Sequence, residues 1–264
     1  MNLEQCGVLP QLATTSDEAR ALLRRDGAVI VSGIGGDSEG ARAIAFDLFG
    51  NAVRAVPPAA RVFEGGEMDR RLPGIDHQVR LAAHTDGYAY GDLYPDYFLL
   101  SCVRASSGGG DSFLVDGYAI LDAMRTDKDL HWVPDALMKV SIDQTESGMQ
   151  HAISPIVQLN HEGRIMVRKT HDQKPAAEST DPARDLAMIA AWQQIAERVA
   201  EQAPRFKLTA NQAVVVDNYR MLHGRDAYTD LNRLLWRVWI WTSGSLGVPD
   251  MPLHSDTRYA AVVS

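Results

Sequence analysis

The chain has 264 residues, 45% of them hydrophobic and 23% charged, with a net charge of -8 and a pI of about 5.4. This composition suits one globular domain with a sizeable core, and the absence of Lys or Arg runs argues against a nucleic-acid partner. No apolar stretch approaches the length of a bilayer span, and no basic, apolar leader opens the sequence. The two cysteines, Cys6 and Cys102, are far apart, which predicts a cytoplasmic protein without disulfides or a zinc-thiolate site.

The first part of the chain predicts two helices and a strand, followed by loops. In chain order we expect a helix over 16–26, a buried strand over 28–33 and a helix over 40–50. Ser16 is a suitable N-cap for the first helix and Gly27 a suitable stop. From Val53 to Arg80, repeated Pro and Gly predict long loops, which in a compact domain often carry function.

Short strands dominate the rest of the chain. The runs typical of strands are YFLLSCV (97–103), SFLVD (112–116), HAISPIVQL (151–159), RIMVRK (164–169), FKL (206–208), AVVVDN (213–218) and RLLWRVWIWT (233–242). One long helix is expected over 181–203, with Asp181 as its N-cap and Leu186 in its apolar stripe. The pattern favours a mainly β fold with flanking helices, a barrel or jelly roll, in one domain over 1–264 with an inserted lid at 144–181.

The triplet His84-Thr85-Asp86 is the first motif that carries chemistry. In an extended strand, residues two apart point to the same face, so this imidazole and this carboxylate would converge on one point. Together they supply two-thirds of a 2-His-1-carboxylate facial triad, which holds iron(II) and leaves other positions open. The triplet alone is a weak signal, because it is common by chance.

A third ligand could come from His223, in the segment DNYRMLHGR (217–225). It follows an apolar strand and a turn. Taken alone, this histidine fits a surface loop, or a core position bonded to a backbone carbonyl, better than a metal site.

Two arginines share one face of the strand RLLWRVWIWT (233–242). Arg233 and Arg237 alternate with residues of an equally apolar opposite face, which predicts a strand buried on both sides. Buried arginines need anionic partners. These could be distant Asp or Glu side chains, or bound carboxylates held by the guanidinium groups. Ser112, just after the turn GGGD, could hydrogen-bond a carboxylate held in this way.

The order of these motifs along the chain resembles the taurine dioxygenase (TauD/TfdA) family and its clavaminate synthase-like relatives. The resemblance covers roughly residues 75 to 242 and implies a double-stranded β-helix, or jelly roll. It implies that His84, Asp86 and His223 bind iron(II), and that Arg233, helped by Ser112, pairs with the distal carboxylate of 2-oxoglutarate. Arg237 would meet an anionic group of the substrate.

One interval departs from the family pattern. The spacing from His223 to Arg233 is slightly shorter than is typical, which leaves Arg237 as an alternative anchor for the cosubstrate. Arg225 is a third candidate, although its position favours bracing of the loop.

The resemblance also implies an activity. Such an enzyme uses dioxygen and 2-oxoglutarate to hydroxylate, desaturate or cyclise a small polar substrate, here an amino acid or an amino-acid-derived metabolite, or alternatively a sulfonate or simple carboxylate. Specificity is expected to come from residues 61–80, from the stretch after the iron motif, and from 144–181. The sequence does not predict the oligomeric state.

Two rival classes use the same three side chains. A non-catalytic metal-binding β-barrel would be free to lose the triad and both arginines, which are intact here. A zinc hydrolase could use His84, Asp86 and His223, but that hypothesis leaves the inward arginines unexplained and supplies no obvious general base.

Overall fold

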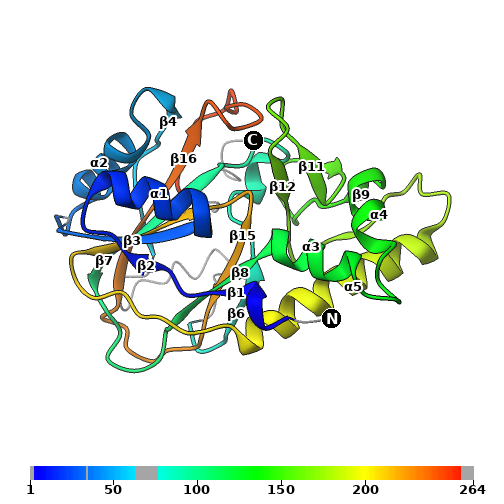
Figure 1. Ribbon diagram of the computed structural model, residues 1–264. Coiled ribbons are helices and arrows are strands. Elements are labelled where there is room, and N and C mark those ends of the chain that lie inside the picture. Colours follow the sequence, from blue (N-terminus) through cyan, green and yellow to red (C-terminus); the bar gives the residue numbers. More distant parts are fainter. Residues whose placement is uncertain (1–2, 34, 63–76, 257–264) are drawn as a thin grey trace.

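Two β-sheets face each other in the computed structural model, which describes residues 3–33, 35–62 and 77–256 (Figure 1). The larger sheet has the order β2 (Gln11–Leu12), β3 (Ala28–Ser32), β14 (Gln212–Asp217), β7 (Tyr97–Arg104), β16 (Leu234–Thr242), β4 (Val53–Ala55), with β5 (Ala60–Val62) also beside β16. The smaller sheet has the order β1 (Gly7–Val8), β8 (Ser112–Asp116), β15 (Met221–Arg225), β6 (Leu81–His84). The predicted mainly β fold is confirmed, and two facing sheets are the arrangement of a jelly roll.

Helices cover the outer faces of both sheets (Figure 1). On the larger sheet lie α1 (Ser16–Asp26) and α2 (Ser38–Phe49). On the smaller sheet lies α5 (Pro182–Gln202), with α3 (Gly117–Arg125) and α4 (Val133–Lys139) packed against α5. Short 3-10 turns occur at Glu4–Cys6, Gly50–Ala52 and Tyr88–Tyr90. No helix in the described ranges is long and apolar enough to cross a membrane.

Alternation along the strands explains why the larger sheet is buried on both sides. In β14, Val214 and Val216 point into the space between the sheets, whereas Ala213 and Val215 pack against α1 and α2. In β16, Trp239 points inward in the same way. The inward side chains of the larger sheet therefore form one wall of the space where the predicted site lies.

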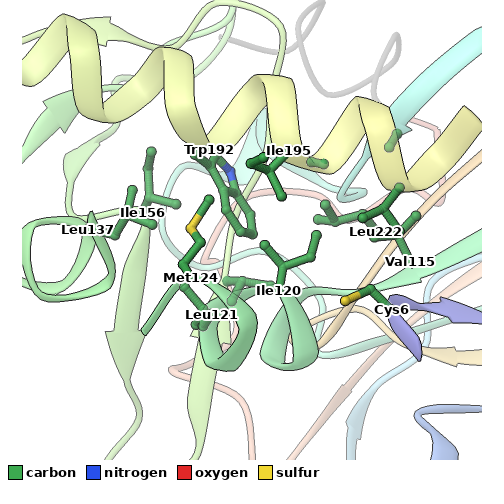
Figure 2. Close-up of a cluster of buried hydrophobic side chains, with 14 of the residues drawn as sticks. Cys6, Val115, Ile120, Leu121, Met124, Leu137, Ile156, Trp192, Ile195 and Leu222 are labelled. Atoms are coloured by element: carbon green, nitrogen blue, oxygen red, sulfur yellow. The ribbon is translucent and has the colours of Figure 1, made fainter. Parts of the chain in front are cut away.

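A second core joins the smaller sheet to its helices. Figure 2 shows Trp192 and Ile195 of α5 above Ile120 and Met124 of α3. Burial of these large apolar side chains supplies most of the stabilisation of such a layer. This core holds α5 across the back of the smaller sheet.

Several local predictions were wrong in detail. The N-cap of α1 is Thr15, whose side chain accepts from the N–H of Glu18, because the Ser16 hydroxyl instead donates to Asp47 at 2.5 Å. Leu186 is 56% exposed, since α5 turns it away from the sheet. The expected strand over 206–208 forms a single bridge between Phe206 and Ser112.

Other predictions for the helices are confirmed or incomplete. Asp181 caps α5 as expected, accepting from the N–H of Arg184 at 3.1 Å. Gly27 ends α1 with φ of 75°, a conformation that glycine adopts without steric cost. The helices α3 and α4 had not been predicted, although Asp116 caps α3 from the end of β8.

The segment 144–181 lies beside α4 and α5 and contains short strands. They are β10 (Ile153–Ser154) and β13 (Lys174–Pro175), both paired with β9 (Ile142–Asp143), and the pair β11 (Val157–Leu159) and β12 (Ile165–Val167). Arg168, 2% exposed, donates to the carbonyl of Gly91 at 2.7 Å and so ties this segment to the stretch after the iron motif. Its role as a lid stays a prediction, and most of the 61–80 loop lies outside the described residues.

Candidate metal centre

Three potential metal ligands converge between the sheets, at one end of the smaller sheet. His84 ends β6, Asp86 follows two residues later, and His223 lies in β15. The two strands pair so that His84 and His223 are direct cross-strand partners, which places both imidazoles on the inner face. The ligand atoms of His84, Asp86 and His223 all lie within 4.8 Å of one another.

The geometry of these side chains suits a shared ion. Nε2 of His84 lies 3.6 Å and Nε2 of His223 3.7 Å from Oδ1 of Asp86. Nδ1 of His84 lies 2.9 Å from the carbonyl oxygen of Ala82. A carbonyl can only accept a hydrogen bond, so Nδ1 carries the proton and the lone pair of Nε2 is free to bind a metal.

The surroundings of Asp86 keep it ionised. Burial by itself raises the pKa of a carboxyl, but the Arg237 guanidinium beside it holds the pKa of Asp86 well below its usual range. Burial, and then the neighbouring His84, lower the pKa of His223 to about 3. The cluster therefore presents a carboxylate and a neutral imidazole at neutral pH, the forms that bind metals.

Three further side chains hold Asp86 in place. Nε1 of Trp239 donates to Oδ2 of Asp86 at 2.7 Å. Asn218, fully buried, accepts from the Asp86 N–H at 2.9 Å and donates to the Asp86 carbonyl at 3.0 Å. Nη1 of Arg237 lies 3.3 Å from both carboxylate oxygens. Both the side chain and the backbone of Asp86 are thus fixed.

Arg237 has protein partners for its charge. Besides Asp86, its Nε donates to the carbonyl of Ser255 at 2.7 Å, and Oδ1 of Asp256 lies 3.9 Å from Nη2. Arg237, which lies in β16, therefore pairs with the carboxylate of the predicted metal centre. Its expected contact with an anionic substrate stays a prediction.

Arg233 is different, because its guanidinium has no carboxylate partner among the described residues. It is 6% exposed, and its Nη1 is buried without a hydrogen-bond partner in the described part of the chain. The guanidinium lies over the ring of Tyr228, 4.9 Å from its centroid. A buried unpaired cation is strongly unfavourable, so this position suits a bound anion.

The glycine turn before β8 lies against Arg233. A Cβ added at Gly110, which has φ of +74°, would lie 3.4 Å from Nε of Arg233. Ser112, half-buried, begins β8 two residues later. The structure thus brings the GGGDS turn next to the arginine with which the sequence analysis grouped it. Arg225, in contrast, donates to the Val79 carbonyl at 2.9 Å and braces the loop before β6, as expected.

The donor set fits the implied iron and 2-oxoglutarate. Two imidazoles and one carboxylate on one side of an ion are the ligands of non-haem iron(II) oxygenases, and the orphaned Nη1 of Arg233 is a place for a carboxylate. Sequence reasoning missed Asn218 and assigned Trp239 to the core alone. Asn218 carried a signal, since it shares the segment 217–225 with His223.

Comparisons with known proteins agree with this geometry. The family model described as "Taurine catabolism dioxygenase TauD, TfdA family" matches residues 7–239. Gamma-butyrobetaine dioxygenase of Homo sapiens is 24% identical over 173 residues, which is 59% of this chain and 43% of that protein. The chain thus spans less than half the length of this curated relative.

Two solved structures resemble the fold. Asparagine oxygenase, in complex with Fe(II), 2S,3S-3-hydroxyasparagine and succinate, has a TM-score of 0.60 at 17% identity and covers 85% of this chain and 78% of its own. PvcB of Pseudomonas aeruginosa, an Fe, alpha-ketoglutarate dependent oxygenase, has a TM-score of 0.60 at 18% identity, over 88% of this chain and 83% of its own. At such identities the likeness establishes the shared jelly-roll fold.

Proposed function

Because the chain belongs to the taurine catabolism dioxygenase TauD, TfdA family, we propose that it is an iron(II)- and 2-oxoglutarate-dependent dioxygenase that oxidises a small, amino-acid-like substrate. The observation that carries this proposal is that a possible metal site and a buried arginine both lie in the protein interior. A cluster of His84, Asp86 and His223 could hold a metal ion, and Arg233 is a buried cation that lacks an anionic partner among the described residues.

Each side chain has a role in this proposal. His84, Asp86 and His223 hold iron(II), while Arg233, with Ser112 nearby, binds the distal carboxylate of 2-oxoglutarate. Iron, when bound with the cosubstrate, supplies the activation of dioxygen that the protein's own side chains cannot perform.

The protein orients the reactants and excludes water. Arg237 and Trp239 keep Asp86 ionised and aimed at the ion position, as their contacts with its oxygens support. The ring of Phe98 lies 4.3 Å from that of His223, so apolar groups close the site from the side of the larger sheet. Such enclosure favours reaction of a bound substrate over side reactions with solvent.

The substrate class follows from the neighbours and remains part of the proposal. Relatives named for asparagine and for gamma-butyrobetaine support an amino acid or an amino-acid-derived metabolite. Hydroxylation is the expected outcome, and a sulfonate or simple carboxylate is the alternative substrate. A cytoplasmic location stays a prediction from the cysteine content.

The rival classes are less well supported. A zinc hydrolase could use the same ligands, but neither it nor a non-catalytic metal-binding barrel gives Arg233 a function. An oxygenase should require ferrous iron and dioxygen, whereas a zinc hydrolase should act without oxygen.

The test is an anaerobic titration of the apo-protein with iron(II) and then 2-oxoglutarate. The expected result is a weak visible charge-transfer band that forms with both present and is absent from Asp86→Ala. Succinate release would then identify substrates. Iron binding without the band would contradict the assignment of the cosubstrate.

A further inference from the structure

The strand that carries His84 lies at the edge of the smaller sheet. Its strand neighbour is β15, and its other side faces α5 and the segment after β12. There, Nζ of Lys169 donates to the Ala83 carbonyl at 2.6 Å, and the Ala83 N–H donates to Oε1 of Glu197 at 3.1 Å. Lys169 and Glu197 are themselves paired at 3.0 Å. The N–H and the carbonyl of Ala83 therefore both form hydrogen bonds with this ion pair, in place of the hydrogen bonds that a neighbouring strand would supply.

The residues directly before and after His84 both form hydrogen bonds with Lys169 or Glu197. Before it, Ala83 is bonded to the ion pair. After it, the Thr85 N–H donates to the carbonyl of Lys169 at 3.0 Å. Glu197 also pairs with Arg80, the residue directly before the same strand, at 3.0 Å. The edge strand is thus tied to α5 and to Lys169 at several points around one residue.

The imidazole of His84 follows the backbone of this strand. Its Nδ1 is bonded to the carbonyl of Ala82, so the direction of Nε2 depends on where the 82–85 backbone lies. An edge strand held by one neighbour alone is free to shift. A fixed ion pair on the open side removes that freedom.

The burial of Lys169 indicates that the ion pair does more than stabilise the fold. Its side chain is 2% exposed, and apolar side chains of similar size would stabilise an interior position at least as well as a buried ion pair. What apolar side chains would not supply is a donor for the Ala83 carbonyl and an acceptor for its N–H. The pair therefore fixes the backbone of the strand as well as filling the space behind it.

We propose that Lys169 and Glu197 are positioning residues for His84, which hold the strand so that Nε2 points at the ion position before a metal binds. This inference rests on the metal role of His84 in the proposed function. Groups bonded directly to a metal ligand typically change metal affinity by about 10–100-fold, and this range is the upper bound for Lys169 and Glu197, which act on His84 through Ala83.

The test compares Lys169→Met, Glu197→Leu and the double variant with Val199→Ala, which loosens the packing of the same helix and leaves the ion pair intact. Two properties are measured without turnover: iron(II) affinity of the apo-protein under anaerobic conditions, and amide hydrogen exchange of residues 81–86 without metal. Each single variant should bind iron(II) more weakly, by up to about 10–100-fold, and exchange faster in this segment. Glu197→Gln keeps an acceptor for the Ala83 N–H. It should therefore recover part of the iron(II) affinity and part of the protection from exchange in residues 81–86.

The double variant separates positioning from stability. It removes the buried Lys169 charge that Glu197→Leu leaves without its partner, while Arg80 loses Glu197 in both of these variants. Its melting temperature should therefore recover relative to Glu197→Leu, whereas its iron(II) affinity should stay low. Val199→Ala should lower the melting temperature and leave iron(II) affinity and exchange of 81–86 unchanged. If affinity recovered together with stability, or followed stability in all variants, the positioning role would be overturned.

His84→Ala tells apart failure of this inference and failure of the proposed function. If His84→Ala bound iron(II) normally, the proposed metal centre itself would be wrong. If His84→Ala lost iron(II) while the Lys169 and Glu197 variants kept it, only the positioning role would fail.

Discussion

Nη1 of Arg237 lies 3.3 Å from each carboxylate oxygen of Asp86, between a strand of the larger sheet and the loop after β6. This contact joins the two sheets at the metal centre. Because Asp86 is 2% exposed, its charge depends on this guanidinium more than on solvent. The pairing makes the stability of the apo-protein depend on pH in a defined way.

The first prediction concerns Arg237→Met. In the wild type the pKa of Asp86 is lowered, so its contribution to stability is present above the unfolded pKa of about 4 and is lost as pH falls further. Without Arg237, burial raises this pKa, and the unpaired carboxylate destabilises the fold by about 3–5 kcal/mol at neutral pH. Protonation removes that penalty, so the difference between variant and wild type should shrink as pH falls from 7 toward 4.

Urea unfolding of the apo-proteins at several pH values measures this difference. In the background of Asp86→Asn, removal of Arg237 should have an effect that varies much less over the same pH range, because only the more distant Asp256 then remains as a carboxylate partner of Arg237. If Arg237→Met lowered the free energy of unfolding by the same amount at every pH in the chain that keeps Asp86, Arg237 would act through packing on Trp239 rather than through charge.

The second prediction concerns the ligands. Replacing His84, Asp86 or His223 with Ala should weaken iron(II) binding by more than the roughly 10–100-fold typical of residues one step removed from the ion, while circular dichroism shows the fold retained. His171 is a matched control, because its ring lies 6.3 Å from that of His84 yet it is outside the converging set. Loss of iron(II) binding in His171→Ala would enlarge the ligand set and contradict this assignment.

The third prediction tests whether Arg233 or Arg237 binds 2-oxoglutarate. Arg233→Met removes a buried cation that has no carboxylate partner among the described residues, so the apo-protein should become more stable. The same change should weaken 2-oxoglutarate binding by at least about 2 kcal/mol, or roughly 30-fold. Thermal shift with and without 2-oxoglutarate measures both effects, since a ligand that binds the folded state raises its melting temperature. If Arg237→Met abolished this shift and Arg233→Met did not, the anchor would be Arg237.

The sequence predicted the convergence of His84, Asp86 and His223 better than it predicted the contacts around them. The order of these residues and Arg233 along the chain carried the resemblance, because residue types in a recurring order can be recognised without knowledge of the contacts they make. Lys169 and Glu197 contact Ala83 from 86 and 114 positions away, and no periodicity encodes which side of a strand will lie at a sheet edge. Asp116 was within reach of local reasoning, because an Asp that ends a strand is a common cap for the helix that follows.

The last prediction concerns Asn218, whose amide holds the backbone around Asp86. Its side chain accepts from the Asp86 N–H and donates to the carbonyls of Asp86 and Pro95, at 2.9, 3.0 and 2.8 Å. Asn218→Ala would leave these buried backbone groups without partners, which costs about 1–3 kcal/mol for each unsatisfied group. Because two of these three groups belong to Asp86, a predicted ligand, iron(II) affinity should fall by about 10-fold or more as well.

Asn160 offers a matched control for this variant. It is 5% exposed, donates to the Gly244 carbonyl at 2.8 Å, and accepts from the N–H groups of Glu162 and Arg164, so it makes a similar set of backbone bonds away from the metal centre. Urea unfolding should show a comparable loss of stability in both variants, and anaerobic titration should show weaker iron(II) binding in Asn218→Ala alone. Equal iron(II) affinities in the two variants would mean that the Asp86 backbone keeps its place without the amide, held by Arg237 and Trp239 through the carboxylate.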